Sequence, residues 1–247
     1  MLNHSLSWTL PPDDLVLSSN QVHVWRASLE QPETLIQQLA QILSEDERVR
    51  ADRFYFERDR KRFIVGRGLL RTILGRYLNR EPKQLQFCYS PRGKPALVDT
   101  GTGSQLQFNL SHSHELALYA VTCDRQIGID LEHMRPTSDL EKLAQRFFSP
   151  HEHSVICSLP AEQKQEAFFR GWTCKEAYLK AIGEGLAQLE QIEVSLIPSE
   201  PAQLLSIAKD SQATKRWSLQ TLTPDPNYKA ALVVEGQDWC LRCWQWN

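Results

Sequence analysis

The stretch Gly128-Ile129-Asp130-Leu131-Glu132 alternates apolar and acidic side chains, a pattern typical of a β-strand with two different faces. Because successive side chains of a strand point to opposite faces, Ile129 and Leu131 would share the face that packs into a core. Asp130 and Glu132 would share the other face and converge in a cleft. Two carboxylates this close repel each other unless a cation or a shared proton lies between them. Mg²⁺ suits such oxygen ligands, although two solvated acids on an exposed strand would give the same sequence.

The segments around this strand predict its place in the fold. Residues 116–122 are apolar enough for a buried strand, and a tight turn at 123–125 would join them in a hairpin to 127–131. Further strands are predicted over 21–26, 192–196, 216–222, 228–234 and 239–246. Helices are predicted over 32–43, from 44, across 63–74, over 138–148, from 149 and over 161–182. Ser44 with Glu47, and Ser149 with Glu152, form capping boxes.

The order of these elements predicts the fold class. Helices, strands, helices and strands follow one another, which indicates an α+β fold. We expect two similar α+β halves, residues 1–122 and 123–247, that meet near the central hairpin. No repeat is visible in the residues themselves, so the sequence is compatible with a duplicated architecture without requiring one.

Length and composition restrict the class of protein. With 247 residues, 41% hydrophobic and 23% charged, the chain suits one large globular domain or two small ones. No apolar run approaches the ~20 residues that span a membrane, and residues 1–10 lack the blocks of a secretion signal, so we expect a cytoplasmic protein. A net charge of −2 argues against a nucleic-acid partner. Cys240 and Cys243 form a lone Cys-x-x-Cys pair, which cannot complete a tetrahedral zinc site by itself.

A second group of charged residues lies in Trp172-Thr173-Cys174-Lys175-Glu176-Ala177-Tyr178-Leu179-Lys180. Glu176 and Lys180 are four residues apart and would share one face of a helix. They could form an ordinary ion pair on a solvated face. Alternatively, Glu176 is a third metal ligand or a base, and Lys175 and Lys180 grip phosphate. Periodicity does not decide between these explanations.

Three further segments carry side chains suited to an anionic ligand. We interpret Phe108-Asn109-Leu110-Ser111-His112-Ser113 as a loop that hydrogen-bonds a ligand, since adjacent Ser and His rarely face each other as nucleophile and base. Gly93-Lys94-Pro95 predicts a rigid turn that presents a lysine, without the second glycine of a P-loop. Ten arginines and Lys61 lie between Arg48 and Arg80, either as a phosphate-binding surface or as a solvated helix face.

Four motifs follow one another between residues 93 and 180: Gly-Lys-Pro, Phe-Asn-x-Ser-His-Ser, Gly-Ile-Asp-x-Glu and Trp-x-x-Lys-Glu-Ala-x-x-Lys. In this order they resemble the 4'-phosphopantetheinyl transferases. Chain length and motif spacing are similar to the monomeric, surfactin-synthetase-activating type. The Asp-x-Glu and Trp-x-x-Lys-Glu motifs are the specific part, and Gly-Lys-Pro alone is weak. The resemblance implies a pseudo-twofold pair of α+β halves with the active site in the cleft between them.

This resemblance implies an enzyme that moves 4'-phosphopantetheine from coenzyme A to a serine of an apo acyl or peptidyl carrier protein. Adenosine 3',5'-bisphosphate would leave. Mg²⁺ would be the cofactor, with Mn²⁺ able to replace it, and coenzyme A the substrate. Carriers would belong to fatty acid, polyketide or nonribosomal peptide synthesis, and nucleic acids and membranes would not be partners. A non-catalytic binder of coenzyme A or carrier protein, and a Mg²⁺-dependent nuclease, are the alternatives.

The resemblance also implies roles for matching residues. Asp130, Glu132 and Glu176 would hold the metal, Glu176 would be the catalytic base, and Lys180 would neutralise the leaving side. Coenzyme A would be bound by Arg48, Arg53, Arg62, Lys94, Pro95, Ser111, His112, Lys175 and Lys180. Of these, His112, Arg62 and either Arg48 or Arg53 would contact the 3'-phosphate.

Glu47, Glu152 and the segment 182–196 lie near these motifs. The family often has lysine where this chain has Glu47, so the cation that meets the 3'-phosphate is left open between neighbouring arginines. Glu152 resembles an acid that recurs in the family, but the capping box with Ser149 favours a structural role. The C-terminal half would dock the carrier through exposed apolar residues of 182–196, for which we single out Leu186 and Leu189.

Overall fold

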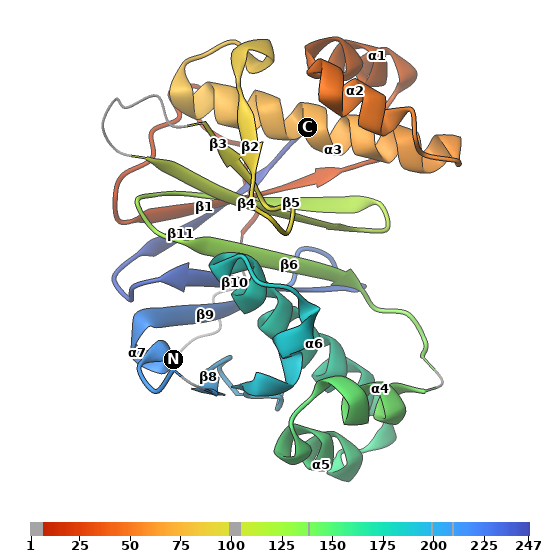
Figure 1. The fold of residues 1–247 in the computed structure, drawn as a ribbon, viewed down its shortest axis with the longest axis vertical. Helices are drawn as coiled ribbons and strands as arrows, with labels where there is room; N and C mark the ends of the chain where they lie inside the picture. The colour runs from red at the N-terminus through yellow and green to blue at the C-terminus, as the bar shows by residue number, and fades with distance from the viewer. Residues whose placement is uncertain (1–6, 99–104, 138, 199, 209) are drawn as a thin grey trace.

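Two β-sheets lie face to face in the middle of the molecule, and helices cover the outer face of each (Figure 1). The computed structural model describes residues 7–98, 105–137, 139–198, 200–208 and 210–247. Residues 1–6, part of the segment considered for a secretion signal, and Ser138, the first residue of one predicted helix, lie outside this set. No helix of the described residues is long and apolar enough to cross a membrane.

The N-terminal half contains the sheet drawn in the upper part of Figure 1 and the helices above it. Its elements are β1 (Gln21–Ser28), α1 (Glu33–Ile42), α2 (Glu45–Ala51), α3 (Glu57–Leu78), a 3-10 turn (Pro82–Gln84), β2 (Phe87–Tyr89), β3 (Pro95–Leu97), β4 (Leu106–Ser113) and β5 (Leu116–Cys123). The predicted strand at 21–26 and the three predicted helices are confirmed. Apolar side chains of α1 and α3 pack against one face of this sheet, which fixes the helices above it.

The C-terminal half repeats this arrangement below. Its elements are β6 (Ile127–His133), α4 (Leu140–Phe147), α5 (Pro150–Ser158), α6 (Ala161–Ile182), a 3-10 segment η2 (Leu186–Gln191), β7 (Ile192–Val194), β8 (Leu204–Ile207), α7 (Ala213–Arg216), β9 (Trp217–Leu222), β10 (Tyr228–Glu235) and β11 (Cys240–Gln245). The long helix occupies the predicted range of 161–182. It ends at Gly183, whose φ of 74° lies in the left-handed region that glycine tolerates.

The two halves share one topology. The strand order is β1-β5-β4 in the first and β6-β10-β9 in the second, with antiparallel pairs throughout. Each half also has one helix of 22 residues, α3 or α6, packed on the outer face. The prediction of two similar α+β halves is therefore confirmed. Between the sheets lies a third core, to which Val24 and Leu118 contribute from one side and Ile129 and Leu232 from the other.

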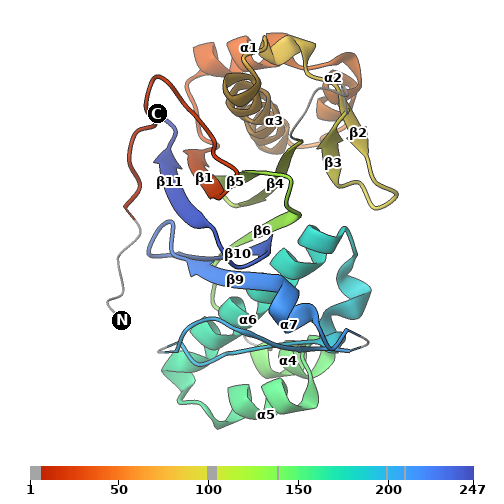
Figure 2. The same cartoon turned by 90° about the vertical axis from the view of Figure 1, so that its left-hand side faces the viewer.

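The last strand crosses from one half to the other. β11 pairs in parallel with β1, so the upper sheet has four strands in the order β11-β1-β5-β4 (Figure 2). Residues 240–245 therefore belong to the C-terminal half by sequence and to the N-terminal sheet by pairing. Cys240 is exposed and Cys243 buried on this strand. No three His, Cys, Asp or Glu side chains of the described ranges are grouped to hold a metal.

The predicted hairpin of 116–122 with 127–131 is wrong. β5 pairs with β1 on one side and with β4 on the other, whereas β6 pairs with β10. Because both edges of β5 are already occupied, the chain that leaves it has no edge to return to. The turn after Cys123 instead carries the chain from the upper sheet to the lower one.

Buried ion pairs anchor corresponding helices in both halves. In α2, the capping-box residue Glu47 accepts a hydrogen bond from Ser44 N (3.0 Å) and pairs with Arg71 of α3 (2.6 Å). In α5, the capping-box residue Glu152 accepts from Ser149 N (2.9 Å) and pairs with Lys175 of α6. All four charged side chains are almost completely buried. The predicted structural role of Glu152 is thus confirmed, and it extends to the burial of a lysine.

We predict that Lys175→Met lowers the free energy of unfolding by about 3–5 kcal/mol, since it leaves the Glu152 carboxylate buried without its cation. Chemical denaturation measures this loss. Lys142→Met is the matched control, because Lys142 forms an exposed ion pair with Asp139, and pairs of this kind contribute less than about 1 kcal/mol. Equal losses in the two variants would show that the buried pair does not stabilise the fold.

A buried histidine lies in the N-terminal half. His23 Nδ1 is 2.8 Å from the Tyr77 hydroxyl, and that hydroxyl accepts a hydrogen bond from Trp25 Nε1 at 2.8 Å. Burial, with a smaller contribution from the charge of Arg242, lowers the pKa of His23 to about 4. The imidazole is therefore neutral in the folded protein over most of the acidic range.

We expect this histidine to make stability fall with pH. Between pH 6.5 and 4 the unfolded chain takes up a proton at His23 that the folded chain does not, so the unfolded state gains about 3 kcal/mol over this window. His23→Asn removes the titrating group, and denaturation at several pH values should show a smaller loss on acidification than in the wild type. Parallel curves for the two proteins would contradict the assignment.

Candidate active site

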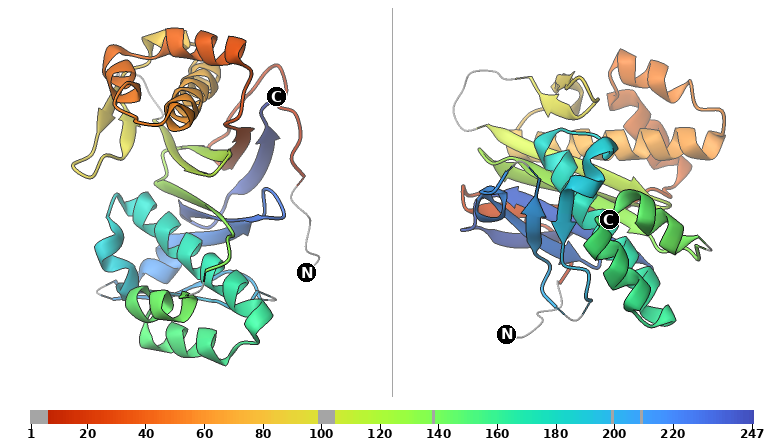
Figure 3. Two further views of the ribbon diagram at one scale, coloured as in Figure 1. Left: turned by 90° about the vertical axis from the view of Figure 1, so that its right-hand side faces the viewer. Right: turned by 60° about the horizontal axis from the view of Figure 1, so that its bottom comes forward.

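The close approach of β6 to α6 brings the acidic strand face against the charged helix. A Cβ atom at Gly128 would lie 2.0 Å from the carbonyl oxygen of Ala177 and 2.4 Å from the nitrogen of Ala181, so only glycine fits there. Ile129 and Leu131 are buried between the sheets, as predicted. Figure 3 (left) shows the green strand β6 beside the teal helix α6. Asp130 and Glu132 share the strand face of Gly128 and therefore face this helix, where their charges and that of Lys180 act on Glu176.

Polar side chains of β4 form the other wall. Asn109 Oδ1, Ser111 Oγ and Ser113 Oγ accept hydrogen bonds from the backbone N–H groups of β6 residues 129, 131 and 133, at 2.8, 3.2 and 3.1 Å. The interpretation of residues 108–113 as a loop was wrong, because they belong to a strand. Their polar residues recur at every second position, which is the period of a strand and gave a signal that the sequence analysis missed.

Asp130 is the most buried acid in this cleft. Its Oδ1 accepts hydrogen bonds from Lys180 Nζ (2.6 Å) and from Ser111 Oγ (3.0 Å), and Lys180 Nζ also lies 2.9 Å from Ser111 Oγ. Its Oδ2 is buried and has no hydrogen-bond partner among the described residues. A buried carboxylate oxygen without a donor is costly, so this atom is available to a ligand that supplies positive charge.

Burial and crowding also affect Glu132 and Glu176. Desolvation, and then the charge of Asp130, raise the pKa of Glu132 above its usual value. Desolvation, together with the charges of Asp130 and Glu132, raises the pKa of Glu176 to about 7, and the charge of Lys180 opposes this rise. The three carboxylates are therefore close enough to repel one another, and one lysine compensates them only in part.

The oxygen atoms of Asp130, Glu132 and Glu176 suit a hard divalent cation. Three carboxylates supply oxygen ligands, and one buried oxygen lacks a partner among the described residues. Desolvation and then the charge of Asp130 raise the pKa of both Glu132 and Glu176, and a bound cation would offset both effects. In the described residues, however, no three such side chains already form a metal-binding cluster. The site is thus chemically suited to a cation, with Lys180 placed against Asp130.

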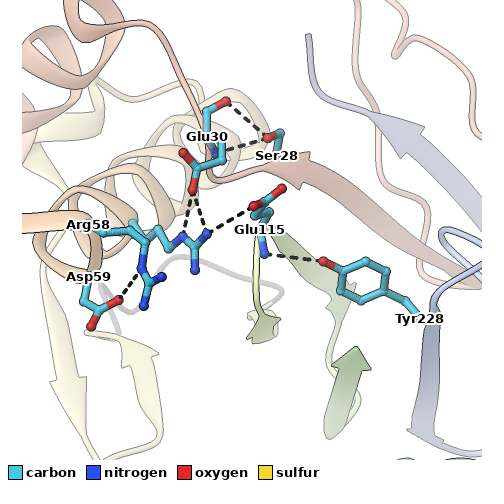
Figure 4. Close-up of polar contacts among 7 residues, drawn as sticks. Ser28, Glu30, Arg58, Asp59, Glu115 and Tyr228 are labelled. Carbon is cyan, nitrogen blue, oxygen red and sulfur yellow. Dashed lines mark hydrogen bonds and ion pairs between the residues drawn. The ribbon is translucent and has the colours of Figure 1, made fainter. Parts of the chain in front are cut away.

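Arg62 and His112 lie on the N-terminal side. Arg62 on α3 donates to Glu30 at 2.7 and 2.9 Å and lies 3.5 Å from Glu115, whose backbone N–H reaches the Tyr228 hydroxyl at 3.4 Å (Figure 4). Tyr228 belongs to β10, so this network joins the two halves. Desolvation and the charges of Lys180 and Arg62 lower the pKa of His112. The positive charges of Lys180 and Arg62 therefore both disfavour protonation of the His112 ring.

Arg53 lines an open cavity of about 1040 Å³ beside α2. Arg50, Tyr89 and Gly93 line it too, and Arg50 was not among the predicted residues. Arg48 is exposed and is not part of the lining. Glu47 lies in the cavity wall, where it pairs with Arg67 (3.0 Å), and Arg67 donates to the Tyr89 hydroxyl (2.6 Å). The acid at this position is therefore structural.

Two predicted lysines have partners inside the protein. The prediction that Lys175 contacts phosphate is wrong, because its buried ammonium is paired with Glu152 and donates to the carbonyl of Leu189. Lys94 donates to the carbonyls of Ile127 (3.1 Å) and Ala181 (3.0 Å), which ties β3 to β6 and α6. Desolvation lowers its pKa to about 8. Pro95, the first residue of β3, borders a second cavity of about 400 Å³.

The sequence matches two family models in succession. Residues 23–124 match "4'-phosphopantetheinyl transferase, N-terminal", and residues 126–233 match "4'-phosphopantetheinyl transferase superfamily". A solved structure of a Bacillus anthracis holo-(acyl-carrier-protein) synthase in complex with CoA covers 45% of this chain and 96% of its own, at 25% identity and a TM-score of 0.37, which is too low to add weight.

Curated relatives match over most of their length. The 4'-phosphopantetheinyl transferase HetI of a Nostoc strain is 55% identical over 246 residues and covers 100% of both chains. A putative 4'-phosphopantetheinyl transferase of Synechocystis is 37% identical over 89% of this chain and 87% of its own. The 4'-phosphopantetheinyl transferase Sfp of Bacillus subtilis is 30% identical over 79% and 84%. The chain therefore belongs to the 4'-phosphopantetheinyl transferase superfamily.

Proposed function

We propose that this protein transfers 4'-phosphopantetheine from coenzyme A to a serine hydroxyl of an apo acyl or peptidyl carrier protein, with adenosine 3',5'-bisphosphate as the second product. The observation that supports this most is the cleft itself. In this cleft Lys180 contacts one carboxylate oxygen of Asp130, and the other oxygen has no partner among the described residues. Glu132 and Glu176 are near enough for the charge of Asp130 to raise the pKa of both. A protein that only bound coenzyme A would have no need of three carboxylates in one cleft.

Asp130, Glu132 and Glu176 would hold Mg²⁺, with Mn²⁺ able to replace it. When bound, this ion supplies positive charge against the pyrophosphate of coenzyme A. Ser111 and Lys180 support the arrangement, because both hydrogen-bond to Asp130 and restrict its rotation. The two-sided wall formed by β4 and α6 limits the access of water to the site.

The reaction forms a bond between the carrier serine oxygen and the β-phosphorus and breaks the bond to the bridging oxygen. Glu176 would accept the serine proton. Lys180 would offset the charge that grows on the leaving phosphate. His112, Arg62 and Arg53 would bind the 3'-phosphate, with Arg48 nearby on the surface. Lys94 and Pro95, at the start of β3, would form one wall of the nucleotide pocket.

We predict that an apo acyl carrier protein gains the mass of one phosphopantetheine when incubated with this protein, coenzyme A and Mg²⁺. EDTA should abolish the gain. Asp130→Asn should slow it by about 10²-fold or more, since it removes a preorganised charge from the reacting centre. Asp238→Asn, at an exposed acid outside the cleft, is the matched control and should react like the wild type. Intact-mass spectrometry makes the measurement, and no gain with acyl or peptidyl carriers would refute the proposed activity.

Of the two leucines predicted to dock the carrier protein, only one is exposed. Leu186 is 51% exposed at the start of η2, directly after α6, whereas Leu189 is 1% exposed and belongs to the core. The choice of Leu189 as a docking residue was therefore wrong. Leu186 remains the proposed contact. We also propose a cytoplasmic monomer, because one chain supplies both walls of the cleft.

Leu186→Asp should raise the KM for the carrier about 10-fold, as expected for the loss of one buried leucine contact. Coenzyme A affinity should not change. Leu205→Asp, at a leucine of similar exposure on β8, serves as the control. Steady-state kinetics with the carrier as the varied substrate test this, and an unchanged KM for Leu186→Asp would exclude this docking surface.

A further inference from the structure

β6 is an edge strand whose outward N–H groups are satisfied in an unusual way. The lower sheet has the order β6-β10-β9, so within the described residues no strand forms a backbone ladder with the other edge of β6. Side chains of β4, which is itself an edge of the upper sheet, take that place through Asn109, Ser111 and Ser113. The two sheets are therefore joined by side-chain oxygens instead of a backbone ladder.

Each of these three β4 side chains suits the β6 residue that precedes the N–H group it binds. Ser111 accepts from the N–H of Leu131 and donates to Asp130 Oδ1 at 3.0 Å. Ser113 accepts from the N–H of His133 and donates to Glu132 Oε2 at 3.0 Å. Asn109 accepts from the N–H of the residue after Gly128, where there is no carboxylate to hold. Serine occurs at the two positions where an acid precedes the N–H.

Ser113 differs from Ser111 because the acid that it holds has no second hydrogen-bond partner among the residues that the structure describes. Ser111 is also contacted by Lys180, which independently holds Asp130. Glu132 has no other hydrogen bond and no ion pair within the described part of the chain. A serine hydroxyl carries one proton, and the N–H of His133 directs that proton toward Glu132 by occupying the acceptor side. Without it, repulsion from Asp130 would favour other rotamers of Glu132.

We propose that Ser113 is a positioning residue that fixes the Glu132 carboxylate for metal binding. The inference rests on the proposed function, because it assumes that Glu132 is a ligand. Groups that orient metal ligands in this way typically change metal affinity 10–100-fold when they are removed. Ser113 would therefore act on metal affinity without touching coenzyme A.

The test is calorimetric titration of Mn²⁺ into the protein saturated with coenzyme A and without carrier, so that no turnover occurs. We expect Ser113→Ala to weaken Mn²⁺ binding about 10-fold or more. Ser113→Thr retains the hydroxyl and should restore the affinity. Ser218→Ala is the matched control: Ser218 also forms several hydrogen bonds on a strand, but none to a carboxylate. Thermal unfolding verifies that each variant is folded.

The outcomes separate this inference from the proposed metal site. If Asp130→Asn weakens Mn²⁺ binding and Ser113→Ala leaves it within about twofold of the wild type, the role of Ser113 is overturned and the site stands. If Ser113→Thr binds as weakly as Ser113→Ala, the hydroxyl is not the cause and the inference is overturned. If Asp130→Asn has no effect, the metal site itself fails. Weakening by Ser113→Ala, with rescue by Ser113→Thr, supports the assignment.

Discussion

The edge of β6 that has no backbone partner among the described strands is the constraint on which the arrangement of this molecule depends. An edge strand with unpaired N–H groups must be paired, covered or solvated. Here it is covered by Asn109, Ser111 and Ser113 of β4, so the contact between the halves is made of side chains. The same serines then reach the acids of β6. The same two serines therefore satisfy the N–H groups at the edge of β6 and hold the acids of the cleft.

The electrostatics of the cleft follow from this contact and from Gly128. Since β6 lies too close to α6 for any Cβ at that glycine, its acids are pressed against Glu176 and Lys180 and lose water. Desolvation disfavours charge, and neighbouring carboxylates add repulsion. Lys180 contacts Oδ1 of Asp130, and Oδ2 has no hydrogen-bond partner within the described ranges. The fold therefore holds a site in a state that added positive charge would stabilise.

The repeated architecture extends to its buried charges. Arg71 lies 14 residues after Glu57, the first residue of α3, and Lys175 lies 14 residues after Ala161, the first residue of α6. Each pairs with the capping-box glutamate of the preceding short helix. Both pairs therefore anchor a short helix to the middle of a long one. The second pair also removes Lys175 from the cleft, although Glu176, the next residue, faces it.

The sequence by itself determined the α+β class, most helix and strand ranges, the shared face of Asp130 and Glu132, and the family resemblance, because these depend on local periodicity and short motifs. The tertiary structure decided which strands pair, and it showed β5 with both edges occupied and β4 as a strand. It also decided that Lys175 and Leu189 are buried. Such outcomes depend on contacts between residues far apart in the chain. The pattern of a single segment contains no information about its neighbour in space.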